Sequence, residues 1–181
     1  ARSFQELLSH LPLWKSALLT NIHFCTDHAT IHEALMEPDP IYLVSDGGAR
    51  PYLTTGSFGW VLATPHLILT EGHGPATGYP IHSFRTEALG RLAGLLFLLH
   101  YTEYYTIRPN GPLLTFLDNT SVITQERQFL QYDALFPTLA GCGDGDVLIA
   151  LKRTHTKLPW TSLQTHHVKG HQDRTARIEE L

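Results

Sequence analysis

The stretch IYLVSDGG, from Ile41 to Gly48, joins a short apolar run to a single acid and a glycine pair. An apolar run of this length that opens into glycines predicts a buried strand ending in a turn. A second run, GSFGWVLA from Gly56 to Ala63, follows closely and predicts the hairpin partner of that strand. The acid, Asp46, therefore lies at the end of the first strand of a predicted sheet.

Two further acids occupy comparable positions. Glu87 stands near the start of a long apolar helical pattern, and Asp118 ends the apolar strand LLTFLD. Carboxylates without compensation are unfavourable in apolar surroundings, and crowding like charges together makes this worse. A divalent cation removes both problems, so the three acids predict a metal site. Taken singly, each acid also fits an ordinary role: a turn aspartate, an acid in the first turn of a helix, and a helix N-cap.

The composition is that of a soluble globular protein with one domain and an extension. The chain has 181 residues, of which 43% are hydrophobic and 17% are charged. No apolar run is long enough to cross a membrane, and the N-terminus lacks the pattern of a signal peptide. Cys25 and Cys142 form no metal motif. We therefore expect an intracellular protein, in the cytoplasm or the nucleus, without a membrane partner.

The basic residues are unevenly distributed. A net charge of -4 argues against indiscriminate binding to nucleic acid. Nevertheless, 6 of the 13 basic residues fall between Lys152 and Arg177, close to several histidines. This region can present a positive face to phosphates, and the alternative is a solvated helix face followed by a basic loop.

The first 37 residues follow a helical pattern, which Pro12 interrupts. Ser3 is the expected N-cap of the first helix, and a second helix is predicted from Asp27 or His28 to Met36. The sequence EPDP, Glu37 to Pro40, then breaks the pattern. We expect a helical extension or connection over residues 1–40 and the main domain over residues 41–181.

From Ile41 onward, the pattern predicts three strands, a helix, a strand, two helices and a final strand. Consecutive strands favour an antiparallel meander, and the later alternation of strands and helices favours parallel crossovers. The predicted fold is therefore α/β, with a mixed five-stranded sheet flanked by helices. The main expected ranges are 66–71 for the third strand, with a continuation to His73 as an alternative, 84–104 for the long helix, 113–118 for the fourth strand, 144–157 for the last helix and 163–168 for the last strand. The sequence GHGPATGYP, from Gly72 to Pro80, is the expected loop after the third strand.

Five motifs in this order resemble the ribonuclease H family: SDGG, GSFGW, SFRTEALG, FLDNTSVI and HHVKGHQD. They are most similar to the ribonuclease H domains that follow reverse transcriptases in eukaryotic retroelements, and they span about Ile41 to Asp173. The resemblance implies hydrolysis of the RNA strand of RNA/DNA hybrids by an endonuclease that uses two Mg²⁺ or Mn²⁺ ions. It also implies an upstream reverse transcriptase domain in the same polypeptide.

The resemblance assigns roles to individual residues. Asp46, Glu87 and Asp118 match the metal-binding acids of the family, and His171 matches a loop histidine that assists proton movement or product release. A zinc site that uses His171 with His166 and His167 is the alternative, although two histidines in a strand do not share a face. The expected substrate contacts are Gly47, Gly48, Ser83, Arg85, Asn119, Lys152, Arg153 and Lys169.

The chain departs from the family pattern after the histidine loop. The family carries a fourth acid on a later helix, and we expect the 181 residues to stop before that helix. Asp173 is the optional further metal ligand, although it lies very close to His171. Two other functions remain open: an inactive domain of the same fold that binds nucleic acid or has a structural role, and a nuclease of the same fold that acts on DNA.

Overall fold

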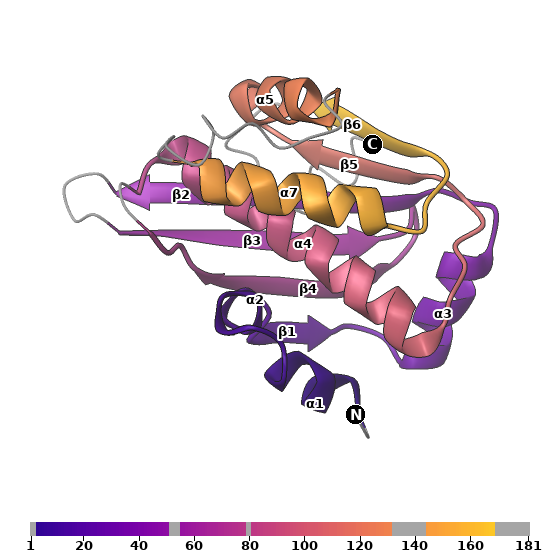
Figure 1. Cartoon of the computed structure of the whole chain (residues 1–181). Helices are drawn as coiled ribbons and strands as arrows, with labels where there is room; N and C mark the ends of the chain where they lie inside the picture. The colour runs from indigo at the N-terminus through magenta and orange to yellow at the C-terminus, as the bar shows by residue number, and fades with distance from the viewer. Residues whose placement is uncertain (1–2, 51–54, 79–80, 132–143, 169–181) are drawn as a thin grey trace.

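The chain folds around one mixed six-stranded sheet with the strand order β1-β4-β3-β2-β5-β6. Figure 1 shows this arrangement in the computed structural model, which describes residues 3–50, 55–78, 81–131 and 144–168. The helices are α1 (Phe4–Ser9), α2 (Leu13–Leu18), α3 (His28–Met36), α4 (Ser83–Tyr105), α5 (Thr120–Leu130) and α7 (Gly145–Lys157). The strands are β1 (Asn21–Phe24), β2 (Ile41–Arg50), β3 (Thr55–Ala63), β4 (Ile68–Pro75), β5 (Leu113–Leu117) and β6 (Leu163–His167).

The five strands predicted from the sequence have the expected directions. Strands β2, β3 and β4 form an antiparallel meander, and β5 and β6 extend the sheet in parallel on the other side of β2. Strand β4 runs to Pro75, so part of the predicted loop GHGPATGYP is strand. Pairing with β3 continues to Pro75 and satisfies the backbone of this glycine-rich segment.

The sixth strand corrects the prediction that residues 1–37 are helical throughout. Asn21–Phe24 pairs antiparallel with β4, and its residues alternate between exposed and half-buried. That alternation has the period of a strand, and Ile22 and Phe24 pack against the hydrophobic core. The short segment is therefore stabilised by the edge of the sheet, which a local sequence pattern cannot show.

The helix starts predicted at Ser3 and at Asp27 or His28 are confirmed by side-chain caps, and α5 has a cap of the same kind. The hydroxyl of Ser3 accepts a hydrogen bond from the backbone N–H of Glu6, and Asp27 and Asn119 cap α3 and α5 in the same way. Pro12 separates α1 from α2, as expected. Each cap satisfies a backbone donor that the helix itself leaves unpaired.

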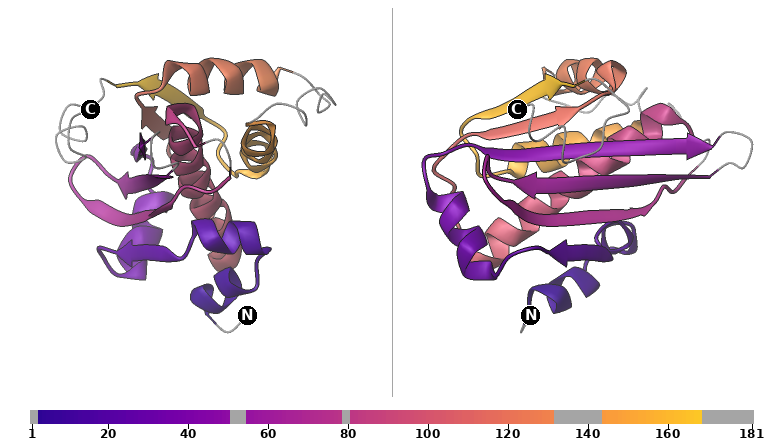
Figure 2. Two further views of the ribbon diagram at one scale, coloured as in Figure 1. Left: turned by 90° about the vertical axis from the view of Figure 1, so that its left-hand side faces the viewer. Right: turned by 180° about the vertical axis from the view of Figure 1, so that it is seen from behind.

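Helix α4 is the central helix of the fold. It lies against β2 and β3, and α7 packs against α4 and α5 (Figure 2). All of its residues from Arg85 to Thr102 are buried. No helix of the described residues combines the length and apolar character needed to cross a bilayer. The helix therefore forms the core layer between the sheet and α7.

The N-terminal extension shares the hydrophobic core of the sheet. Phe4 is buried, and its ring lies 5.8 Å from that of Phe97 and 5.3 Å from that of Tyr101, measured between centroids. Leu18 and Leu19 belong to the same cluster of buried residues. The extension thus adds both apolar area and a strand to the fold.

Candidate metal centre

The positions of two of the three predicted acids, Asp46 and Asp118, follow from the pairing of β2 with β5. The last parallel pair joins Val44 to Phe116. Asp46 and Asp118 each lie two residues beyond this pair, where β2 continues alongside β3 alone. Because side chains alternate along a strand, the two acids project near the same point where the parallel strands part.

Glu87 reaches the same point from α4, because two glycines bring the helix against the strand. A Cβ atom at Gly47 would lie 2.3 Å from the carbonyl carbon of Thr86 and 2.6 Å from the backbone nitrogen of Glu87. A Cβ atom at Gly90 would lie 2.8 Å from the carbonyl oxygen of Asp46. Both contacts are too short for any side chain, so this close approach requires glycine at each position.

The structure brings the three acids together. One carboxylate oxygen from each of Asp46, Glu87 and Asp118 lies within 4.8 Å of the others. Glu87 is only 3% exposed, whereas the two aspartates are half-buried. The backbone N–H of Gly47 donates a hydrogen bond of 2.9 Å to Asp46. Within the described residues, this is the only cluster of three or more acidic, histidine or cysteine side chains that could hold a metal ion.

Burial makes the charge of Glu87 unfavourable. Desolvation raises the pKa of Glu87 to about 10, and the neighbouring Asp118 and Asp46 add to the increase. Its Oε2 atom is buried and has no hydrogen-bond partner in the structure. A divalent cation would give the Oε2 atom of Glu87 a partner and would offset the repulsion among the three carboxylates, and carboxylate oxygens are the ligands that Mg²⁺ prefers. The donor set therefore fits such an ion.

Solved structures with the same architecture share this arrangement of elements. The chain is similar to LC11-RNase H1 in complex with an RNA/DNA hybrid, with a TM-score of 0.53, 18% identity, and coverage of 78% of this chain and 92% of that chain. It is also similar to the N-terminal RNase H domain of a Mycobacterium tuberculosis protein, with a TM-score of 0.52 and 14% identity. That match covers 78% of this chain and 94% of the other.

The chain has the ribonuclease H-like fold. No model of a protein family matches its sequence, and no curated protein matches it either. The fold is therefore recognised through structure at low sequence identity. The predicted fold class is confirmed, with β1 as an additional strand at the sheet edge.

Arg85, a predicted substrate contact, is held by contacts within the protein, and its contact with a substrate stays a prediction. Its guanidinium is buried and donates hydrogen bonds of 3.0 and 2.9 Å to the two carboxylate oxygens of Asp146. Asp144 lies 3.5 Å away, and the carbonyl of Thr77 accepts a further hydrogen bond. Asp146 and Asp144 raise the pKa of Arg85 and so stabilise its charged form. Within this ribonuclease H-like fold, Arg85 ties the start of α4 to the start of α7.

The two predicted substrate contacts on α7, Lys152 and Arg153, differ in their exposure to solvent. Lys152 is only 8% exposed, whereas Arg153 is exposed on the same helix, and the contact of either residue with a substrate stays a prediction. Arg153 lines a cavity of ≈ 580 Å³ between α2, α4 and α7, together with Lys15 and Lys157. Lys169, His171 and Asp173 lie outside the described residues.

The remaining predicted contacts lie close to the three acids along the chain. Ser83 is the first residue of α4, and Asn119 caps α5 directly after Asp118. A Cβ atom at Gly48 would meet nothing within 4 Å, so this position is open. Gly47, by contrast, has no room for a side chain, because a Cβ atom there would press on the backbone of α4 at Thr86 and Glu87. The contact of either glycine with a substrate stays a prediction.

The two strand histidines are both engaged with the protein. The Nε2 atom of His167 lies 3.0 Å from the carbonyl oxygen of Asp118, and that of His166 lies 3.1 Å from Oε1 of Gln164. The ring of His166 also stacks on Phe116. Neither histidine joins a metal-binding group among the described residues. The zinc alternative also needs His171, which lies outside the described residues, so it stays untested.

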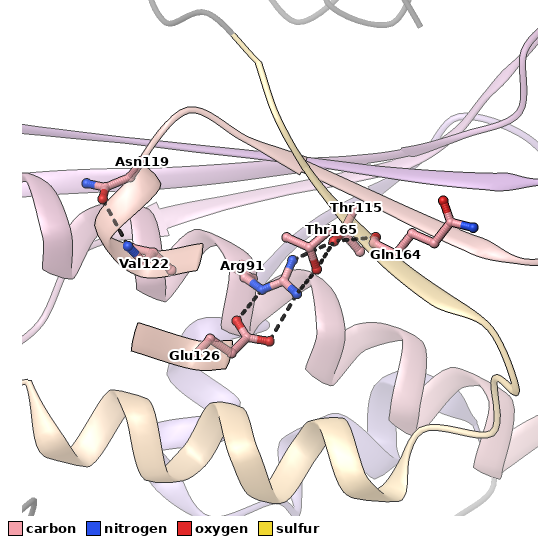
Figure 3. A network of polar contacts seen from close by, with 7 residues as sticks. All are labelled: Arg91, Thr115, Asn119, Val122, Glu126, Gln164 and Thr165. Atoms are coloured by element: carbon pink, nitrogen blue, oxygen red, sulfur yellow. Dashed lines mark hydrogen bonds and ion pairs between the residues drawn. The ribbon is translucent and has the colours of Figure 1, made fainter. Parts of the chain in front are cut away.

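A buried polar network beside the acids was missed by sequence reasoning. Figure 3 shows Arg91 between Glu126, Thr115 and Thr165. Arg91 donates hydrogen bonds to both carboxylate oxygens of Glu126, to Thr115 at 2.7 Å and to Thr165 at 3.0 Å. The network joins α4, α5, β5 and β6 one helical turn from Glu87. An arginine inside an apolar helix was the available signal, because such a charge needs a partner.

Proposed function

We propose that this chain is a divalent-metal-dependent nuclease that hydrolyses the RNA strand of RNA/DNA hybrids. The observation that carries the proposal is the convergence of three carboxylates on one point, with Glu87 buried and one of its oxygens unpartnered. Crowded and buried carboxylates are unfavourable without a counter-charge, and a divalent cation is a suitable one. The similarity to a structure that contains an RNA/DNA hybrid supports the choice of substrate.

The proposed reaction gives each acid a defined part. Asp46, Glu87 and Asp118 would hold Mg²⁺ or Mn²⁺, and a pair of such ions supplies an activated water and stabilises the leaving oxygen of a phosphodiester. The rigid positions of the acids on β2, α4 and the end of β5 fix the place of the scissile phosphate. Asp46 and Asp118, which are half-buried, open the cluster to a substrate, while Glu87 lies behind them.

The narrower context is also a proposal. We propose that the chain is the ribonuclease H part of a retroelement polyprotein with an upstream reverse transcriptase domain. The order of the motifs from SDGG to HHVKGHQD supports it. The residues encoded upstream of Ala1 test this directly, since the proposal requires polymerase motifs there.

The activity is tested by cleavage of an end-labelled RNA/DNA hybrid in Mg²⁺. We expect cleavage by the wild type, loss of at least about a hundredfold in Asp118→Asn, and no loss in Glu33→Gln, which removes an exposed acid from α3. Single-stranded RNA, duplex RNA and duplex DNA of the same sequence serve as comparison substrates. Equal cleavage of duplex DNA would favour the DNA-acting alternative, and binding without any cleavage would favour the inactive one.

A further inference from the structure

A groove leads from the acid cluster across the sheet to the N-terminal extension. It has a volume of ≈ 550 Å³ and is lined by Asp46, Gly47, Gly48, Gly56, Ser57, Phe58, His73, Gly74, Pro75 and Asn21. These residues come from β2, β3, β4 and β1, so four neighbouring strands form it. Asn21 and His73 are exposed. The groove therefore continues beyond the metal centre onto the strand that the extension adds.

The strand registers place the polar residues of the groove in one row. Asp46 pairs with Gly59, Gly59 with His73, and His73 with Asn21. Cross-strand partners project on the same face of a sheet, so the side chains of Asp46, His73 and Asn21 share a face. Gly59 places no side chain between Asp46 and His73.

This row lies on the face of the sheet opposite α4. Leu43 contacts α4, because a Cβ atom at Gly94 would lie 2.8 Å from its Cδ1 atom. Side chains alternate along β2, so Asp46, three residues later, projects to the other face. Three strand spacings of about 4.8 Å separate β2 from β1, which makes the row about 14 Å long. This length corresponds to a few nucleotides of a bound strand.

The side chains at the far end suit a nucleic-acid backbone. Asn21 offers an amide that both donates and accepts, and the imidazole of His73 can donate a hydrogen bond to an oxygen. Such groups commonly contact phosphate and sugar oxygens, and these contacts position a substrate without reading its sequence. A 2′-hydroxyl can pair with either side chain as well.

We propose that Asn21 and His73 bind the sugar–phosphate backbone of the cleaved strand, three and two strand spacings from Asp46, or about 14 and 10 Å. The inference rests on the proposed function and extends it, because β1 makes the N-terminal extension a part of the substrate site. Asn21 and His73 are positioning residues, since they bind the strand away from the reacting phosphate.

The test compares hybrids of increasing length on either side of a single cleavable position. In the wild type, KM falls as the hybrid is extended on the side that reaches β1. In Asn21→Ala and in His73→Ala, extension of the hybrid no longer lowers KM. KM for the long hybrid rises by roughly threefold to tenfold, which is the effect of one lost hydrogen bond, while kcat stays within about twofold. Asn21→Asp keeps the shape but repels phosphate, so we expect a larger rise in KM.

His23→Ala is the matched control, because His23 lies on β1 and pairs with Glu71 in a neighbouring row, outside the lining of the groove. Thermal unfolding of each variant establishes that the fold is retained. Unchanged KM values in the Asn21 and His73 variants, or an equal rise in His23→Ala, would overturn the inference while leaving the nuclease function intact. A wild type that neither binds nor cleaves the hybrid would overturn both.

Discussion

At the scale of single residues, the buried carboxyl of Glu87 determines how the metal-free protein responds to pH. Its pKa in the folded state is about 10, compared with an ordinary value of 4.5. The folded state therefore holds a proton between these values that the unfolded state has released, and the stabilisation by this group is lost as the pH rises through this window. The cluster is most stable without metal when Glu87 is neutral.

We therefore expect the free energy of unfolding of the metal-free wild type to fall from pH 5 to pH 9. The glutamine in Glu87→Gln does not titrate, so the stability of this variant should depend less on pH over the same range. Urea denaturation in EDTA at several pH values measures the difference, with Glu33→Gln as the control. Identical pH profiles for the wild type and Glu87→Gln would show that Glu87 titrates normally.

Substitution of alanine at Gly47 and at Gly48 compares a crowded position with an open one on the same strand. A methyl group at Gly47 would press on the backbone of Thr86 and Glu87, whereas one at Gly48 meets nothing within 4 Å. We expect Gly47→Ala to destabilise the protein by about 1–3 kcal/mol, as overpacking does, and to weaken metal binding by displacing Glu87. Gly48→Ala should change stability by less than about 0.5 kcal/mol. Thermal unfolding and Mn²⁺ titration of both variants measure this, and equal effects would contradict the role of Gly47.

At the scale of elements, the network around Arg91 holds α4, α5, β5 and β6 in register. Arg91 and Glu126 are both buried, and removal of one partner leaves the other charge without compensation. We expect Arg91→Met to lose about 3–5 kcal/mol of stability and the double variant Arg91→Met, Glu126→Leu to recover part of that loss. Urea denaturation of the single and double variants tests it. A double variant less stable than the single one would argue that the hydrogen bonds to Thr115 and Thr165 dominate.

The elements also show what the sequence could and could not predict. The convergence of Asp46, Glu87 and Asp118 was predictable because each acid lies near the end of an apolar element, and apolar elements meet in a core. Strand β1 was not, because the four residues NIHF become a strand through pairing with β4 almost fifty positions later. The partner of Arg85 was equally remote, since Asp146 follows it by 61 positions. Local patterns report burial and period, whereas pairing between distant segments depends on the finished fold.

At the scale of the whole molecule, the N-terminal extension belongs to the folded unit. Phe4 packs among aromatic rings of α4, whereas Leu13, on the next helix, is 86% exposed. We expect Phe4→Ala to cost about 3–5 kcal/mol, as for other buried aromatic residues. Leu13→Ala should cost less than about 0.5 kcal/mol. The midpoints of unfolding of the two variants measure the difference. A Phe4→Ala variant as stable as the wild type would mean that the extension is only loosely attached.

The proposed nuclease function depends on a divalent cation at the point where β2, α4 and the end of β5 meet. Crystals soaked in Mn²⁺ and measured at the manganese absorption edge show directly where the ion binds. We predict an anomalous peak within bonding distance, roughly 2.0–2.3 Å, of carboxylate oxygens from Asp46, Glu87 and Asp118, and its loss in crystals of Asp118→Asn. A map without a peak at these carboxylates, or with an unchanged peak in the variant, would contradict the assignment of this cluster as the metal centre.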